Sequence, residues 1–325
     1  MFTLRQYLLA LLDSRGLTRT LGEIDVCRDE QGRPCFSAGN SAAVFRIRLG
    51  GRIRSLRCYL RPMRHLKEIY GQRLLEKELY LHTSPETGVW VDTVLGDWIE
   101  GSTLHETVAQ AAALRDRESL QILVRLFDRL ALALVTDNRA HGDLKPENII
   151  VGDDGTLCPI DFDASYLPAF AGEISPELGT AAYQHPARTA ADFDERIDDY
   201  PAALISTALH ALAEDPTLWD RYGSSDGLLY TPQRIASDPA YRETLALFEK
   251  RGMAVQYRIA QLLTAPTLRL FGLAELLAEA VREKPAVRSG TEAETPELFV
   301  ENGRWGYRTA ERVVVAPLYD NGFDF

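Results

Sequence analysis

The chain has few cysteines and no long hydrophobic run, and these two absences exclude several classes of protein. Its four cysteines, Cys27, Cys35, Cys58 and Cys158, include no C-x-x-C pair, so the sequence predicts neither a zinc site nor a disulfide framework. No uninterrupted apolar stretch approaches the ~18 residues that a membrane-spanning helix needs. Acidic residues outnumber basic ones and give a net charge of −11, which disfavours nucleic acid and anionic membranes as partners. We therefore expect a cytoplasmic protein with reduced thiols.

What remains is the composition of an ordinary globular protein. A chain of 325 residues is long enough for about two or three compact units, and 46% hydrophobic with 26% charged residues is typical of globular domains. The apolar run at 7–12 is too short for a secretory signal and ends at Asp13. We predict an N-terminal helical extension over residues 1–30, docked on the body of the protein.

The most informative segment covers residues 141–163 and begins with the sequence HGDLKPEN. It places two carboxylates, an ammonium and a carboxamide at fixed separations: Asp143, Asp161, Lys145 and Asn148. Phosphoryl transfer from a nucleotide needs such a set, because one carboxylate accepts the hydroxyl proton, a cation lies near the transferred group, and the amide and second carboxylate hold magnesium on the phosphates. Asp154-Gly155 lies between two β-rich runs, which predicts a hairpin that folds Asn148 and Asp161 back toward one another.

This segment resembles the catalytic loop and metal-binding strand of protein kinases, H-R-D-x-K-x-x-N and D-F-G. The resemblance implies a two-lobed α+β fold, with a small β-rich N-lobe over 31–97 and a large helical C-lobe over 98–281. It also implies a bacterial serine/threonine protein kinase that uses ATP and Mg²⁺, with Mn²⁺ as an alternative ion. Asp143 would be the catalytic base, Lys145 the cation, and Asn148 and Asp161 the metal ligands.

The hydrophobic pattern agrees with strands first and helices later. It predicts strands at 34–60 and 89–99, helical periodicity at 65–81, a long buried helix through 120–134, and further helices at about 195–213 and 239–281. Gly50-Gly51 has the form of a two-residue hairpin connection between two of the strands.

The resemblance also assigns nucleotide contacts to the strand-rich part. A turn in the place of the glycine-rich loop keeps Gly39 and Val44. On the third strand Ser55 would lie under the adenine, and Arg57 would replace the lysine that contacts the α- and β-phosphates. Arg61, four residues on, is the alternative for this position. The hairpin would place Arg57 near Val44, on the same side of the sheet.

Further positions follow from the same resemblance. Glu68, on the helix after the third strand, would pair with Arg57, and Glu76 is the alternative partner. Residues 95–104 resemble the hinge between kinase lobes, where backbone groups of Asp97 and Ile99 would bind the adenine edge. Ile150 would form part of the pocket floor.

Two later features favour a protein substrate. Residues 179–186, GTAAYQHP, resemble the G-T-x-x-Y-x-x-P-E that closes a protein kinase activation segment. Asp198 resembles the aspartate that braces the catalytic loop from the next helix.

Departures from the kinase pattern keep two other functions open. Gly142 replaces the arginine of H-R-D, which implies activity independent of activation-loop phosphorylation. Asp163 replaces the glycine of D-F-G, and together with Arg57 and the thinned glycine loop it leaves open a pseudokinase that binds nucleotide without chemistry. The H-G-D and I-D-F-D sequences also resemble aminoglycoside phosphotransferases, so a small-molecule kinase is the second alternative.

The C-terminal part has a different pattern. Residues 282–297 are charged, carry two prolines and read as a linker. Residues 298–325 resemble one WG repeat, a β-hairpin with a turn at Asn302-Gly303. Because one such unit buries too little surface to stand alone, we expect it either to pack on the kinase domain or to belong to a longer array that is cut off at Phe325. A protein partner is a further expectation for this segment.

Overall fold

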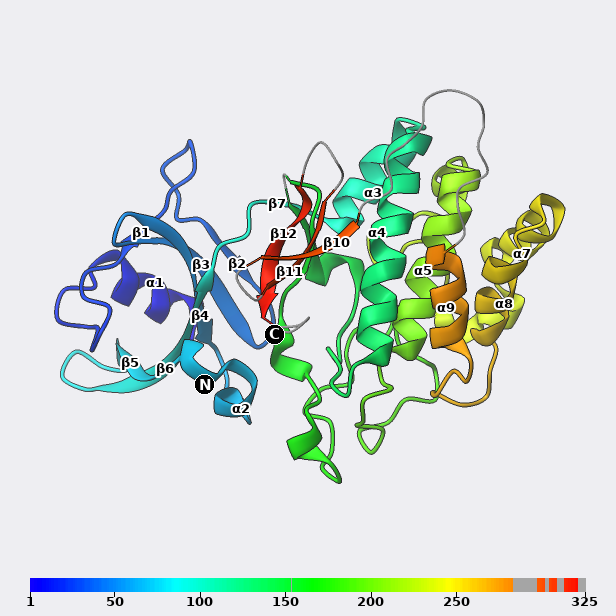
Figure 1. Cartoon of the computed structure of the whole chain (residues 1–325). Helices are drawn as coiled ribbons and strands as arrows, with labels where there is room; N and C mark the ends of the chain where they lie inside the picture. Colours follow the sequence, from blue (N-terminus) through cyan, green and yellow to red (C-terminus); the bar gives the residue numbers. More distant parts are fainter. Residues whose placement is uncertain (153, 283–296, 302–303, 309–312, 321–325) are drawn as a thin grey trace. The chain divides into compact units, whose positions relative to one another are not determined.

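The computed structural model describes residues 1–152, 154–282, 297–301, 304–308 and 313–320 (Figure 1). The chain is α+β, with a curled antiparallel sheet and several helices. It divides into two compact units, the first spanning Met1–Ile99 and the second beginning at Glu100.

The first unit is built on an antiparallel sheet that has six strands among the described residues. Its strands are β1 (Asp25–Val26), β2 (Phe36–Ala38), β3 (Ala42–Leu49), β4 (Arg52–Tyr59), β5 (Leu74–His82) and β6 (Gly88–Asp97). The order is β1-β3-β4-β6-β5, and β2 pairs with β3. Gly50 and Gly51 both have positive φ, as a tight hairpin between β3 and β4 requires, so the predicted strands and their connection are confirmed.

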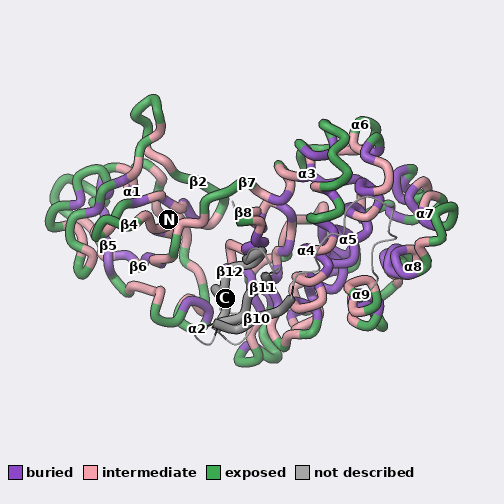
Figure 2. Tube along the Cα trace, turned by 45° about the horizontal axis from the view of Figure 1, so that its top comes forward, coloured by how far each residue is buried: buried purple, intermediate pink, exposed green. Residues whose placement is uncertain are grey.

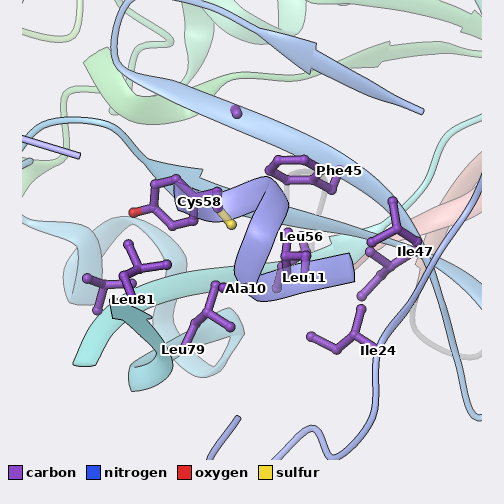
Figure 3. Packing of buried hydrophobic residues seen from close by; sticks show 13 residues of the cluster. Ala10, Leu11, Ile24, Phe45, Ile47, Leu56, Cys58, Leu79 and Leu81 are labelled. Atoms are coloured by element: carbon purple, nitrogen blue, oxygen red, sulfur yellow. The ribbon is translucent and has the colours of Figure 1, made fainter. Parts of the chain in front are cut away.

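Helix α1 (Leu4–Leu12) packs on one face of this sheet. A capping box between Thr3 and Gln6 starts the helix, and its buried face carries Tyr7, Ala10 and Leu11. Strand β3 turns alternate residues toward this face, where they are buried. The cluster labelled in Figure 3 contains Ala10, Leu11, Ile24, Phe45, Ile47, Leu56, Cys58, Leu79 and Leu81. The docked N-terminal helix is thus confirmed, but it is shorter than the predicted extension over 1–30 and shares the core of the sheet.

The helix predicted over 65–81 is wrong for most of its length. Helix α2 covers only Leu66–Tyr70, a 3₁₀ turn follows at Gly71–Arg73, and the remainder is strand β5. Gly71 ends the helix with a positive φ. Lys77 also has a positive φ, and the register of β5 against β6 shifts between Leu75 and Leu79. This bulge displaces the alternation of the strand, so the spacing of its leucines imitates a helix.

The second unit is mainly helical. Its helices are α3 (Leu104–Ala113), α4 (Arg117–Thr136), α5 (Asp199–Glu214), α6 (Leu218–Tyr222), α7 (Pro239–Arg251), α8 (Ala254–Leu262) and α9 (Leu273–Arg282). A small antiparallel sheet joins β7 (Gly101–Thr103), β8 (Ile149–Gly152) and β9 (Leu157–Pro159). Short 3₁₀ turns lie at Pro146–Asn148, Phe162–Ala164, Pro168–Phe170 and Pro232–Ser237.

Helices α4 and α5 form the centre of this unit and pack against one another. Nearly every residue of α5 is buried, as Figure 2 shows. The buried carboxylate of Asp128 on α4 links the two helices, because it accepts a hydrogen bond from Ser206 Oγ at 2.6 Å and lies 2.8 Å from His210 Nε2. The predicted long buried helix is confirmed as α4. The predicted helical region at 239–281 consists of three helices, the first ending at Gly252 in the left-handed conformation.

The last described segment is a three-stranded antiparallel sheet of β10 (Glu297–Glu301), β11 (Arg304–Arg308) and β12 (Val313–Asp320). Trp305 pairs with Val300 on one side and with Tyr319 on the other. Residues 283–296 of the predicted linker, and the predicted turn at 302–303, lie outside the described residues. Among the helices that the structure describes, none combines the length and apolar character needed to cross a membrane.

Candidate active site

A hairpin in the second unit places two of the predicted site residues. Strands β8 and β9 pair with Ile149 opposite Pro159, and the N–H of Ile160 donates to the carbonyl of Asn148 at 2.9 Å. Asp161 therefore follows directly after the residue that faces Asn148, as the Asp154-Gly155 signal predicted. Asp161 has φ +68°, a left-handed conformation that aspartate adopts more readily than most residues. A non-glycine residue held in this region is a common feature of functional sites.

Asp143 lies at the centre of a cluster of hydrogen-bond donors. Its Oδ2 is 3.2 Å from Lys145 Nζ and 3.2 Å from Asn148 Nδ2, which also donates to the Asp143 carbonyl at 2.9 Å. Its Oδ1 accepts the backbone N–H of Thr180 at 2.6 Å. Lys145 Nζ in turn donates to Thr180 Oγ1 at 2.8 Å. The structure thus brings together three of the predicted residues and adds Thr180, all around one partly buried carboxylate.

The side chain of Asp198 binds the backbone of the loop that carries Asp143. This carboxylate is buried and accepts the backbone N–H of His141 on one oxygen and that of Gly142, at 3.0 Å, on the other. The predicted brace is confirmed. Burial raises the pKa of Asp198, whereas the two N–H groups and the nearby Arg188 cation favour its charged form.

The imidazole of His141 extends the same network. Its Nε2 is 2.8 Å from the carbonyl of Ile160, and its Nδ1 accepts the N–H of Asp143 at 3.4 Å. This pattern requires the proton on Nε2. The histidine therefore connects the strand before Asp161 to the loop that holds Asp143.

Asn148 and Asp161 offer oxygen ligands of the kind that Mg²⁺ prefers. Because Nδ2 of Asn148 donates to Asp143, its Oδ1 is the atom that could face a cation. Magnesium is commonly held by one or two carboxylates together with substrate phosphates and water. This donor set fits magnesium. Within the described part of the chain, no cluster of three or more His, Cys, Asp or Glu side chains has the arrangement of a metal site.

Three candidate nucleotide residues of the first unit, Val44, Ser55 and Arg57, share one face of its sheet. Val44 on β3 lies directly opposite Arg57 on β4, as predicted. Both alternate with residues that are buried under α1, so they belong to the other face. Ser55 is two positions from Arg57, and its Oγ donates to the carbonyl of Asp97 at 3.0 Å. Gly39 lies in the turn between β2 and β3, where an added Cβ would meet only the Ala42 carbonyl oxygen, at 3.9 Å.

The remaining candidates are placed less closely. Glu68 is in the first turn of α2, and its pairing with Arg57 stays a prediction. Glu76 lies on strand β5 and not on the helix. Its carboxylate is 3.5 Å from the exposed Lys67 ammonium. Ile99 is the last residue of the first unit. Ile150, on β8 of the second unit, is half-buried and pairs with Thr103 and Cys158.

No protein-family model matches the chain, but individual curated proteins do. It is 28% identical to the serine/threonine-protein kinase PknL of Mycobacterium tuberculosis over 213 residues, which is 62% of this chain and 52% of that protein. It is 28% identical to CBL-interacting protein kinase 17 of Oryza sativa subsp. japonica over 171 residues, 50% of this chain and 35% of that protein.

A third relative is the serine/threonine-protein kinase chk1 of Schizosaccharomyces pombe, at 25% identity over 160 residues. That match covers 48% of this chain and 31% of chk1. The chain thus spans about half the length, or less, of these relatives. These similarities support a protein kinase-like family.

At Gly142 this chain departs from the H-R-D of the kinase pattern. The residue has φ +82°, and an added Cβ would lie 2.0 Å from the carbonyl oxygen of Ala164. An arginine at this position could not be accommodated without moving the backbone. The carbonyl of Gly142 instead accepts a hydrogen bond from Arg188 Nη1 at 2.9 Å.

Sequence reasoning missed two residues of this site. Thr180 lies within residues 179–186, which the sequence had already singled out, so it could have been considered as a partner of the Asp143 loop. Arg188 follows Pro186 and Ala187 and carried no sequence signal. The role of Arg188 becomes visible only in the structure, where residues 179–188 pack against the loop and Arg188 contacts Gly142.

Proposed function

We propose that this chain transfers the γ-phosphoryl group of ATP to a serine or threonine hydroxyl of a protein substrate. The observation that carries the proposal is the Asp143 carboxylate, fixed by the Thr180 amide and lying beside Lys145 and Asn148. Phosphoryl transfer depends mainly on positioning and on electrostatic stabilisation, and this cluster supplies both.

The residues of the second unit would divide the work. Asp143 would orient the acceptor hydroxyl and take its proton on a carboxylate oxygen. Lys145, already 3.2 Å from that carboxylate, would place positive charge beside the moving phosphoryl group. Asn148 and Asp161 would hold Mg²⁺, which when bound supplies charge neutralisation on the phosphates.

For the first unit we propose nucleotide binding. Gly39, Val44 and Ser55 would contact the nucleotide through small or apolar groups, and Arg57 with Glu68 would position the α- and β-phosphates. An arginine can contact a phosphate with two N–H groups, although its planar fork differs from the compact ammonium of lysine. The backbone groups of residues 97 and 99 would bind the adenine edge. In the second unit, Ile150 would contribute an apolar side chain to nucleotide binding.

Two observations support a protein as the acceptor. The named relatives are protein kinases, and residues 179–186 contact the catalytic loop through Thr180. Residues 179–186 resemble the sequence that closes a protein kinase activation segment. The sheet β10–β12 is proposed as a WG-type module that binds a protein partner.

The test is transfer of radiolabelled phosphate from [γ-³²P]ATP to casein and to kanamycin, with and without Mg²⁺. We expect labelled casein only in the presence of the metal ion. Asp143→Asn should abolish transfer and leave nucleotide binding intact, because it removes the proton acceptor and keeps the shape. Asp220→Asn, which alters an exposed carboxylate paired with Arg115, is the matched control. Equal turnover of the Asp143 and Asp220 variants would exclude Asp143 as the base.

A pseudokinase is the second candidate, and the short helix α2 favours it. Glu68 lies on a helix of only five residues, which gives little support for an ion pair with Arg57. Binding of ATP without labelling of any acceptor would favour this candidate. Labelled kanamycin with unlabelled casein would instead favour the small-molecule kinase suggested by the H-G-D sequence.

A further inference from the structure

Arg188 is a buried cation that the proposed chemistry leaves without a role. The side chain is 8% exposed, and Nη1 donates both to the carbonyl of Gly142 and to Oε1 of Gln184. Nε and Nη2 are also buried and have no hydrogen-bond partner in the described structure. Burial lowers the pKa of Arg188, while the carboxylates of Asp198 and Asp143 favour its charged form. Burying a guanidinium so incompletely paired is costly, so its position calls for a compensating function.

The contact with Gly142 fixes the peptide group that precedes Asp143. Asp198 holds the N–H of Gly142, and Arg188 holds its carbonyl, which belongs to the peptide joining Gly142 to Asp143. The two contacts therefore fix successive peptide groups from different elements. Since the side chain at 142 is excluded by Ala164, this position cannot supply a cation itself, and the Gly142 carbonyl is contacted by Arg188 from another segment.

Within residues 179–188, Gln184 and Gly179 lie close to the loop carbonyl that Arg188 contacts. Gly179 has φ +71°, and an added Cβ would lie 2.7 Å from Gln184 Nε2, 2.9 Å from the Gly142 carbonyl and 3.0 Å from Asp143 Oδ1. The side-chain amide of Gln184, the loop carbonyl and the central carboxylate therefore converge at one point. Arg188 closes this group by donating to both the loop and Gln184.

We propose that Arg188 is a positioning residue for phosphoryl transfer. Its guanidinium holds the Gly142–Asp143 peptide and couples it to residues 179–188, so that Asp143 is kept in place without a phosphorylated activation segment. This inference rests on the proposed function of the site. It assigns to a residue outside the H-G-D sequence a role in holding the loop.

The test compares Arg188→Met and Arg188→Lys with Arg196→Met. Arg196 is the matched control, because its guanidinium also donates to a backbone carbonyl, that of Val135, and its other side-chain partner among the described residues is Asp199 on α5. With casein as acceptor, Arg188→Met should lower kcat on the order of 10²-fold, as expected when a reacting group is misplaced, and leave the KM for ATP unchanged. Arg188→Lys should recover part of kcat, because it keeps the charge and loses the fork.

Hydrogen exchange of residues 141–145 provides a second measurement that needs no activity. We expect faster exchange there in Arg188→Met than in Arg196→Met. An equal kcat and equal exchange in these two variants would overturn the proposal. If wild-type protein labels no acceptor, the proposed function loses support while exchange alone still decides whether Arg188 holds the loop. If Arg188→Met does not fold, Arg188→Lys carries the same comparison.

Discussion

Replacing Gly142 by alanine would introduce a methyl group where the backbone of Ala164 already lies. The new Cβ would be 2.0 Å from the Ala164 carbonyl oxygen, and the residue would have to keep φ +82°. A left-handed conformation costs an alanine about 1–2 kcal/mol relative to glycine. Relief of the overlap adds about 1–3 kcal/mol, the usual cost of forcing an extra group into packed structure.

Gly172→Ala separates these two contributions. Gly172 lies in the same unit with φ +86°, and an added Cβ would meet nothing within 4 Å. This control therefore pays only the conformational cost. Thermal unfolding should show a midpoint for Gly142→Ala that is lower than that of Gly172→Ala by about 2–12 °C, given about 2–4 °C per kcal/mol for a unit of this size.

The phosphotransfer assay provides the functional half of the same experiment. Gly142→Ala should lose transfer to casein because relief of the overlap moves the neighbouring Asp143, whereas Gly172→Ala should retain it. Equal midpoints for the two variants would refute the close approach of Gly142 to Ala164. Retained transfer in Gly142→Ala would refute the link between this approach and the position of Asp143.

Three other substitutions test features of the two units. Burial raises the pKa of Asp199 to about 7, so the folded protein keeps a proton that the unfolded chain releases near pH 4. As the pH rises from about 4 to about 7, this group should therefore lower the stability of the wild-type protein by up to about 1.4 kcal/mol per pH unit. Urea unfolding of Asp199→Asn should lack this slope; parallel pH curves would contradict it. Glu78→Gln should destabilise the first unit by about 3 kcal/mol, because the buried Glu78 carboxylate accepts three consecutive backbone N–H groups. The control Glu76→Gln changes an exposed carboxylate and should have little effect in the same urea unfolding experiment. Tyr7→Phe should cost about 0.5–1.5 kcal/mol by removing the 2.6 Å hydrogen bond from the Tyr7 hydroxyl to the carbonyl of Tyr59, and an unchanged unfolding midpoint would exclude that role.

The loop that carries Asp143 could be predicted from sequence because its geometry is local. Asp143, Lys145 and Asn148 lie within six residues, and the 3₁₀ turn that begins at Pro146 brings the amide of Asn148 back to Asp143. Asp161 is joined to them by one short hairpin, for which Asp154-Gly155 is a strong signal. Short-range hydrogen bonds and turn residues were sufficient for this part of the site.

Strand β5 could not be predicted in the same way. The bulge at Lys77 depends on pairing with β6, which includes the bond from the Lys77 N–H to the carboxylate of Asp92 at 2.7 Å. A spacing of leucines cannot distinguish a bulged strand from a helix when the partner strand is unknown. For the same reason Glu76 was predicted on a helix, whereas it lies at an exposed position on strand β5.

Arg188 shows a second limit, and it bears on how the loop is held. A buried arginine is recognised by what surrounds it, and its contacts, Gly142 and Gln184, come from a loop and a segment whose approach no local pattern specifies. The two unusual residues are nevertheless connected physically. Close approach of Ala164 excludes any side chain at 142, so this position cannot supply the cation found in the usual kinase sequence. The cation that contacts the Gly142 carbonyl comes instead from another segment, as Arg188. The glycine and the distant arginine are therefore two parts of one arrangement around Asp143.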